Sequence, residues 1–184
     1  MSEAHAHVDP ANKKVALFIA VLALVLAFAE TLGKGAQTNA LASHIEASNL
    51  WAFFQAKTIR QTTVRTAAEE IEAQFGQRAP EAVKKQVEAW KKTAERYQSE
   101  PETNEGRKEL MARAKEMETK RDRAMSAYHN YEIASAAVQI AIVLASAQII
   151  TGVAALLWIA YALGAVGVAF SLIGFFWPTA VHLF

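Results

Sequence analysis

The chain has 184 residues, no cysteine and a formal net charge of +1, with 53% hydrophobic and 20% charged residues. The lack of cysteine excludes disulfides, thiolate nucleophiles and thiolate metal sites. The near-zero net charge gives no reason to expect nucleic acid as a partner. Residues 15–32 contain one charged side chain, Glu30, and residues 133–184 contain none apart from His182, whereas 17 of the 19 lysines and arginines lie in residues 34–131. This distribution predicts apolar ends in a lipid bilayer and a helical middle in water.

The N-terminal region predicts an uncleaved membrane anchor. Asp9 and Pro10 are typical of a helix start, with Asp as N-cap and Pro in the first helical position. Lys13 and Lys14 precede an apolar run, as in a signal peptide, and Ala-Phe-Ala around Phe28 fits a cleavage site. The run is nevertheless about 18 residues long, which is enough to cross a bilayer. We therefore expect the first transmembrane helix here.

The charged middle has a repeat close to 3.5 residues. Apolar side chains recur there at alternating steps of four and three, which predicts a face that packs on a partner helix as in left-handed coiled coils. Lys57, Gln61 and Arg121 interrupt this face, and polar residues at such positions cost stability but can fix the register. The face consists of Leu50, Phe54, Lys57, Gln61, Val64, Ala68, Ile71, Phe75, Val83, Val87, Trp90, Ala94, Tyr97, Leu110, Ala114, Met117, Arg121, Ala124, Tyr128 and Tyr131.

Helix lengths predict how the middle is arranged. Gly76 is a plain candidate for the residue that ends a helix. At about 1.5 Å per residue, residues 36–75 rise roughly 60 Å, and residues 81–98 and 107–132 together rise roughly 65 Å. We therefore expect one long outgoing helix and a return arm that is broken at residues 99–106. The alternative is a compact three-helix bundle, in which the break would reverse the chain direction.

The C-terminal apolar block is about 50 residues long, which is too long for one span and right for two. Thr151-Gly152 predicts the turn between these spans, and the first of them should continue the return arm. The expected fold is all-α, with three transmembrane helices and a long extramembrane antiparallel helical hairpin, coiled-coil-like, between the first and second. The predicted segments are an N-terminal tail (1–13), transmembrane helix 1 (14–33), the hairpin (34–131), transmembrane helix 2 (132–150), transmembrane helix 3 (153–177) and a C-terminal tail (178–184).

Small side chains recur along the last predicted span. Because lipid provides no hydrophobic force between helices, close approach of small residues supplies much of their packing. We predict a helix-packing surface, either within one chain or between subunits, although glycine and alanine are also common in membrane helices. The candidates are Ala160, Gly164, Gly167, Ser171 and Gly174.

Four polar residues, Glu30, Lys34, Gln139 and Gln148, lie in or beside the apolar spans. An ionisable residue in a span is a functional candidate. Lys34 follows Glu30 by four residues, however, which suits an ion pair at the membrane surface. We expect that interfacial pair first, and a ring of carboxylates or a cation site in an oligomeric pore second. The glutamines either bond to neighbouring helices or line a polar path.

Few other residues suggest chemistry. Trp51, Phe53 and Phe54 form an aromatic cluster, for which we expect the hairpin core rather than a binding surface. His5 and His7 are too few for a metal site and suit a mobile tail. The sequence has no G-x-S-x-G nucleophile motif and no Gly-rich phosphate loop. We therefore expect no catalytic residues, no cofactor and no resident metal.

Three segments carry a family resemblance: AETLGK from Ala29, WAFFQAKTIR from Trp51 and QIAIVLAS from Gln139. Together they resemble DUF4337, a bacterial membrane family of unknown function, over most of the chain beyond the N-terminal tail. The tryptophan-containing segment is the most specific part. The resemblance implies a small multi-pass membrane protein of bacteria and brings no activity or substrate. The resembled family often carries basic residues in the turn between the last two helices. This chain departs from that pattern, because the turn reads Thr-Gly-Val-Ala-Ala, so the usual cue to membrane topology is missing.

The charge cues for membrane orientation conflict. Lys13 and Lys14 favour a cytoplasmic N-terminus and a translocated hairpin, whereas the basic hairpin favours the cytoplasm, and loops longer than about 60 residues follow the rule poorly. We expect the bacterial inner membrane, with the hairpin in the periplasm. The preferred function is a homo-oligomeric structural or interaction protein. The alternatives are an oligomeric channel or transport component and an accessory subunit of a larger membrane complex.

Overall fold

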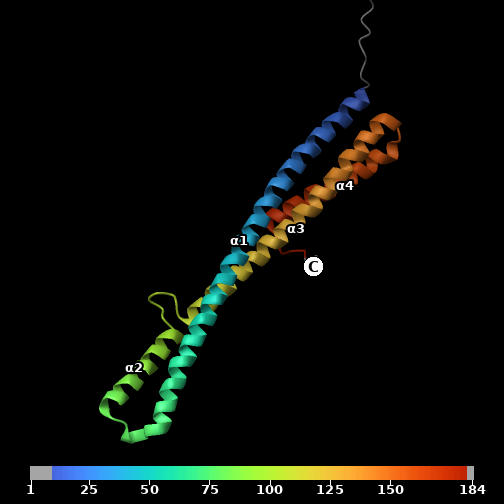
Figure 1. The fold of residues 1–184 in the computed structure, drawn as a ribbon. Coiled ribbons are helices and arrows are strands. Elements are labelled where there is room, and N and C mark those ends of the chain that lie inside the picture. Colours follow the sequence, from blue (N-terminus) through green and yellow to red (C-terminus); the bar gives the residue numbers. More distant parts are fainter. Residues whose placement is uncertain (1–9, 182–184) are drawn as a thin grey trace, which may run out of the picture. The chain divides into compact units, whose positions relative to one another are not determined.

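The computed structural model describes residues 10–181, and every regular element among them is helical, which confirms the predicted all-α class. The predicted features at His5, His7 and Asp9 lie outside the described residues. The elements are α1 (Pro10–Phe75), the short 3-10 helix η1 (Gly76–Arg78), α2 (Glu81–Gln98), α3 (Arg107–Thr151) and α4 (Ala154–Phe176) (Figure 1).

The helices end where turn-forming residues occur. Gly76 follows the last residue of α1 with a φ of 50°, and Gly152 follows α3 with a φ of 72°. Both values are left-handed, a region that glycine adopts with little strain. The gap between α2 and α3 is residues 99–106, where the sequence predicts a break in both the hairpin and the three-helix bundle. The expected continuity of the second apolar span with the preceding charged helix is also observed, because both lie in α3.

Packing divides the chain into two units. The first contains residues 1–40 and 122–184, and the second contains residues 41–121. The described part of the first unit therefore holds the start of α1, the end of α3 and all of α4. The second unit holds the rest of α1, all of α2 and the start of α3.

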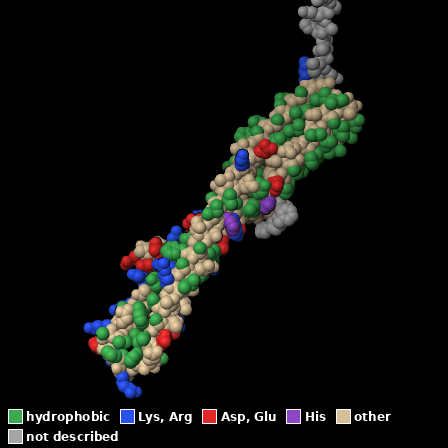
Figure 2. Space-filling view, in the orientation of Figure 1, with side chains coloured by type: hydrophobic (Ala, Val, Ile, Leu, Met, Phe, Trp, Pro, Cys, Tyr) green, Lys and Arg blue, Asp and Glu red, His purple; other side chains and the backbone are tan. Residues whose placement is uncertain are grey.

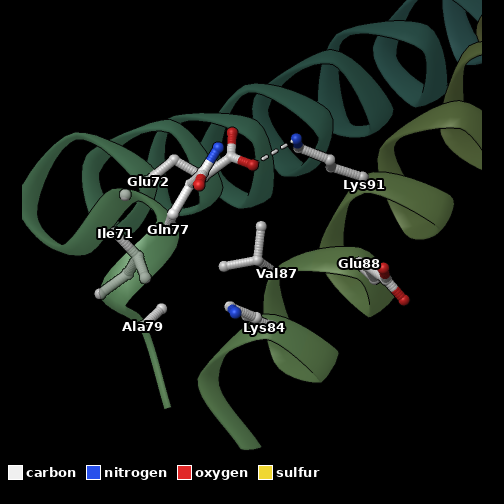
Figure 3. Close-up of a pocket in the computed structure, with 9 residues that line it drawn as sticks. Ile71, Glu72, Gln77, Ala79, Lys84, Val87, Glu88 and Lys91 are labelled. Atoms are coloured by element: carbon white, nitrogen blue, oxygen red, sulfur yellow. Dashed lines mark hydrogen bonds and ion pairs between the residues drawn. The ribbon is translucent and has the colours of Figure 1, made fainter. Parts of the chain in front are cut away.

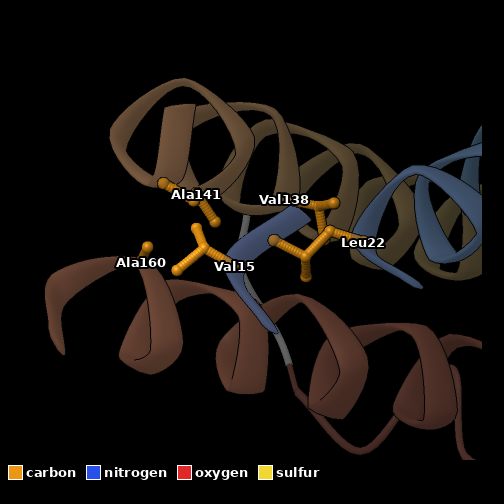
Figure 4. Close-up of a cluster of buried hydrophobic side chains, with 6 residues drawn as sticks. Val15, Leu22, Val138, Ala141 and Ala160 are labelled. Atoms are coloured by element: carbon orange, nitrogen blue, oxygen red, sulfur yellow. The ribbon is translucent and has the colours of Figure 1, made fainter. Parts of the chain in front are cut away.

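Three helices meet in the core of the first unit (Figure 4). Val15 and Leu22 of α1 are buried against Val138 and Ala141 of α3 and against Ala160 of α4. Leu22 is only 2% exposed, and Ala160 is fully buried. The branched side chains of α1 thus fill the space that small residues on the other two helices leave, which is the tight packing that protein interiors require.

The outer surface of the first unit is apolar as well. The side chains of Leu17, Leu24 and Phe28 are each more than half exposed, and hydrophobic side chains cover the visible face of α4 and the start of α1 (Figure 2). Apolar patches of this extent on a soluble monomer are rare. α1, α3 and α4 each include a segment long and apolar enough to cross a membrane. These features are typical of membrane association.

In the second unit, α2 and α3 contact successive stretches of α1. Glu72 of α1 forms an ion pair with Lys91 of α2, with 2.6 Å between nitrogen and oxygen. Nearer the start of α1, Trp51 donates a hydrogen bond of 2.8 Å to Glu118 of α3. Figure 2 shows Lys, Arg, Asp and Glu side chains along the edge of α2 and gathered around the segment that follows it. The charged residues of α2 are all exposed, and its buried residues are Val87 and Ala94.

The packing face is the one that the spacing predicted. Its buried members are Leu50, Lys57, Ala68, Val87, Ala94, Leu110, Ala114 and Tyr131. Phe75 is an exception, because it is 43% exposed at the last residue of α1. The chain turns directly after Phe75, and α2 begins only at Glu81, so α2 does not cover this ring.

Candidate functional site

A polar contact joins α1 to α3 inside the first unit. The side-chain nitrogen of Gln139 donates a hydrogen bond of 3.1 Å to the carboxylate of Glu30. The sequence marks both residues as candidates but gives no reason to pair them across 109 positions. A hydrogen bond to a charged acceptor is among the stronger ones, and it offsets part of the cost of a carboxylate in an apolar helix.

The contact lies at a groove of about 370 Å³ that also includes Lys34 and Glu132. Among the described residues, Glu30 and Lys34 form no ion pair with each other, so the expected i,i+4 pair is replaced by the bond to Gln139. Tyr128 donates a long hydrogen bond of 3.5 Å to Glu132 at the same groove. Two carboxylates beside an ammonium and an amide can bind a cation or a polar headgroup.

Gln148 lies apart from this groove. Its side-chain oxygen is buried and accepts no hydrogen bond within the described residues, and its backbone oxygen accepts one of 2.8 Å from Gly152. An unpaired buried acceptor costs about 1–3 kcal/mol. The structure therefore brings three of the four predicted polar residues to one groove and leaves the fourth near the turn between α3 and α4.

Asn130 is a buried polar residue that the sequence reasoning missed. Its side-chain nitrogen donates hydrogen bonds of 2.9 Å to the backbone oxygens of Ser126 and Pro178. The residue is fully buried, and its own side-chain oxygen has no partner within the described residues. The bond to Pro178 attaches the segment after α4 to α3. A single asparagine before an apolar run was the available signal, and nothing in the sequence links it to a residue 48 positions later.

The small residues of α4 face their own chain. A Cβ atom added at Gly164 would lie 3.0 Å from Leu22, and one added at Gly167 would lie 2.3 Å from Val138. A methyl group at Gly167 would overlap Val138, and one at Gly164 would require Leu22 to move by a few tenths of an ångström. The sequence leaves open whether these residues pack within one chain or between subunits. These two glycines pack within the chain.

The rest of the strip follows the same pattern. A Cβ atom at Gly174 would lie 3.1 Å from the ring of Tyr131. Ala160 is buried in the core, and the hydroxyl of Ser171 donates a hydrogen bond of 2.9 Å to the backbone oxygen of Gly167. The strip thus lets α4 approach both α1 and α3 closely, and it satisfies its one hydroxyl within the helix.

Lys57 is the buried charge of the second unit, with 6% of its surface exposed. Its ammonium nitrogen lies 3.4 Å from a carboxylate oxygen of Glu100 and 3.9 Å from one of Glu105. It also lies 5.6 Å from the ring centroid of Phe53 and 5.3 Å from that of Tyr97. A buried ammonium is costly unless it is paired, and here two carboxylates and two aromatic faces surround it.

Arg107, the first residue of α3, makes polar contacts to both α1 and α2. It donates hydrogen bonds to Thr58 at 2.9 Å, to Gln98 at 3.0 Å and to Gln61. Its guanidinium lies 5.1 Å from the ring centroid of Phe54. Both polar residues that interrupt the predicted α1 face in this unit, Lys57 and Gln61, therefore have partners, and a shift of register would break these bonds.

The aromatic cluster divides between core and surface. Trp51 and Phe54 pack edge to face with ring centroids 5.4 Å apart, and both lie against a cluster that contains Leu50 and Leu110. Phe53 points differently and is 37% exposed. The predicted core position is therefore observed for two of the rings, while the third is half covered beside Lys57.

The segment between α2 and α3 is held by Glu109. Its carboxylate accepts hydrogen bonds from the hydroxyl of Ser99 at 2.6 Å and from the backbone nitrogen of Glu100 at 3.1 Å. The bond from Ser99 lowers the pKa of Glu109 below its usual value, because it favours the charged form. A Cβ atom at Gly106 would lie 2.4 Å from the nitrogen of Glu100, so this close approach requires glycine.

A groove of about 520 Å³ lies where α1, η1 and α2 meet (Figure 3). Ile71 and Val87 form an apolar part of its wall, and Lys84 lies beside them. The ion pair of Glu72 with Lys91 borders it. Sequence reasoning placed no site here, and the groove contains none of the candidate residues.

The described chain is all-α. It combines helices with apolar outer surfaces, three of which are long and apolar enough to cross a membrane, with a charged helical unit that has buried polar contacts. No group of three or more His, Cys, Asp or Glu residues suited to a metal occurs within residues 10–181. The chain belongs to the DUF4337 family, a domain of unknown function, whose model matches residues 11–177. Comparison with curated proteins and with solved structures found no match.

Proposed function

We propose that this chain is a membrane-anchored scaffold, in which three spans hold a helical hairpin outside the bilayer as an interaction arm. One observation carries the proposal: the division of charge coincides with the division of packing. The three apolar segments belong to the unit of residues 1–40 and 122–184. The unit of residues 41–121 holds all lysines and arginines except Lys13, Lys14, Lys34 and Arg123.

The order of contacts supports a hairpin. As the residue number on α1 rises from Trp51 to Glu72, the number of the partner falls from Glu118 to Lys91. This order is what an antiparallel return arm gives, with α3 and α2 following one another along α1. A bundle in which residues 99–106 reverse the chain would place α2 and α3 side by side along the same stretch of α1.

The buried polar contacts support a role in positioning rather than in chemistry. Lys57 and Arg107 connect α1 to the return arm through ion pairs, hydrogen bonds and aromatic rings. Such contacts fix one register of a helical arm, which is useful for holding a partner at a set position. The contacts of Lys57 and Arg107 hold helices together and include no reacting group. We propose that the chain is a homo-oligomer and not an enzyme.

Membrane extraction and native mass spectrometry test this proposal together. We expect the full chain to stay with the membrane in alkaline carbonate and to give an oligomer when released in mild detergent. A peripheral membrane protein expressed in the same cells is the control for carbonate release. Recovery of the chain in the carbonate supernatant, or a monomer alone in detergent, would contradict the proposal.

We propose that the chain lies in a bacterial inner membrane with its hairpin in the periplasm. Glu102 lies in the exposed segment between α2 and α3, and the chain has no cysteine of its own. The Glu102→Cys variant in intact cells should therefore react with a membrane-impermeant maleimide. The cysteine-free parent controls for background labelling. Labelling that occurs only after lysis would place the hairpin in the cytoplasm.

A second candidate is an oligomeric channel or transport component, and the bond between Glu30 and Gln139 supports it. Paired polar side chains inside apolar helices are typical of ion paths. Glu30→Gln should then sharply reduce ion flux in liposomes, whereas Glu46→Gln, on the hairpin, should leave it unchanged. Flux that is absent, or unaffected by Glu30→Gln, would remove this candidate. Affinity purification at native expression would reveal a third case, an accessory subunit of a larger complex.

A further inference from the structure

α1 carries a second apolar stripe in the second unit, separate from the face that packs on α2 and α3. Its large members are far from buried: Leu41 is 60% exposed, Ile45 52% and Ile59 67%. We call this the outer stripe. Its positions, all exposed, are Ala42, Ile45, Asn49, Ala52, Ala56, Ile59 and Thr63, flanked by Leu41 and Phe53.

The outer stripe has the spacing of a coiled-coil seam. Its positions alternate by three and four residues, so Ala42, Asn49 and Ala56 are a positions and Ile45, Ala52 and Ile59 are d positions. The buried residues Leu50 and Lys57 fall one place after the a positions and face the return arm instead. None of the a and d positions between residues 42 and 63 is charged. The stripe is therefore built like a helix interface, yet nothing in the described chain covers it.

We infer that a second copy of this chain covers the outer stripe, with the two α1 helices parallel and in register. Asn49 is the reason to expect an identical helix as the partner. A polar residue at one a position is costly against an apolar surface, but two such amides that face each other in register can hydrogen-bond. An identical helix supplies the matching amide at the matching position.

The charged residues beside the stripe do not oppose this parallel arrangement. In a parallel pair, each e position lies near the g position of the preceding heptad on the other helix. Glu46 would then lie near Leu41 of the second copy, and Arg60 would lie near Gln55. Neither contact places like charges together, so the arrangement carries no electrostatic penalty at the flanks.

The contact area explains why the pairing needs the membrane. Residues 41–63 rise roughly 34 Å, and a helix face about 10 Å wide gives about 340 Å² per copy. Stable interfaces in solution bury about 800 Å² per partner. Anchoring in one bilayer aligns the copies and raises their effective concentration, so this inference rests on the proposed membrane anchorage.

Cysteine cross-linking tests the inference in full-length protein in its membrane, because the chain has no native cysteine. Under mild oxidation, Ile45→Cys and Ala52→Cys should each form a disulfide-linked dimer. His44→Cys is the matched control, since it is also exposed and one residue away but lies outside the stripe. The expected result is a dimer band for each of the two stripe variants and no dimer band for the control. Equal cross-linking at His44, or none at either stripe position, would overturn the inference.

A second variant separates the stripe from other sources of oligomers. Ile45→Glu combined with Ile59→Glu should abolish the cross-link at Ala52→Cys, while the circular dichroism spectrum stays helical because both positions are exposed. If native mass spectrometry shows an oligomer that this pair does not affect, the spans alone assemble the protein. The scaffold proposal would then stand and the outer stripe would fail. Cross-linking to a different protein in place of a dimer would also overturn the inference.

Discussion

At the scale of single residues, polar side chains in apolar surroundings decide how the helices fit. Lys57, Glu30 and Asn130 each interrupt an apolar face or run, and each has a partner on another part of the chain. Lys57 and Asn130 are buried, whereas Glu30 is exposed, and the cost of burying the first two is offset only in one alignment of the helices. These residues therefore select a register more than they add stability.

The pair between Lys57 and its carboxylates gives a direct prediction. Lys57→Ala should lower the free energy of unfolding by about 1–3 kcal/mol, because Glu100 loses its buried partner. Thermal unfolding followed by circular dichroism in detergent measures this. Arg60→Ala, three residues along and exposed, should change stability by no more than about 0.5 kcal/mol. Equal effects of the two substitutions would mean that the Lys57 contacts are not formed.

Glu109 predicts how stability depends on pH. Its pKa is lowered in the folded chain by the bond from Ser99, so the unfolded state binds the proton more readily. The stabilisation is therefore present above the usual carboxyl value and is lost as pH falls through the lower folded value. The melting temperature of the wild type should exceed that of Glu109→Gln near neutral pH, and the gap should close on acidification. A gap independent of pH would contradict the bond.

At the scale of elements, the helix ends and the packed face could be predicted from sequence, whereas most partners could not. Gly76 and Gly152 mark ends because turns need their left-handed backbone, which is a local property. The alternation of apolar residues identified the buried face of α1 because it too is local. The bonds from Gln139 to Glu30 and from Asn130 to Pro178 depend on tertiary geometry, and no spacing along one helix encodes them.

Substitution by alanine should have opposite effects on stability at two helical glycines. Gly167→Ala should cost about 1–3 kcal/mol through overpacking, because the new methyl group would meet Val138 and the backbone of Ala134. Gly35→Ala meets nothing within 4 Å and should gain up to about 1 kcal/mol from helix propensity. Paired thermal melts in detergent compare the two. Stabilisation by Gly167→Ala, or no effect of it, would show that α4 does not pack closely on α3.

At the scale of the whole molecule, the three apolar segments and the exposed segment between α2 and α3 make a prediction about proteolysis, given the proposed periplasmic hairpin. A glutamate-specific protease added to spheroplasts should cleave near Glu102, which is exposed between α2 and α3. The N-terminal fragment keeps the apolar segment of α1, and the C-terminal fragment keeps those of α3 and α4. Both fragments should stay with the membrane after a carbonate wash. Release of either one would contradict three membrane spans.

The bond of Asn130 to Pro178 has a practical consequence for reporter fusions. It places the backbone just after α4 beside the residue that precedes the second apolar span. If α3 and α4 both cross the bilayer, the last two spans return the chain to the leaflet at which the second span began. A phosphatase reporter joined to the C-terminus would then occupy the compartment that Asn130 faces, and the activity of this reporter would show which compartment that is.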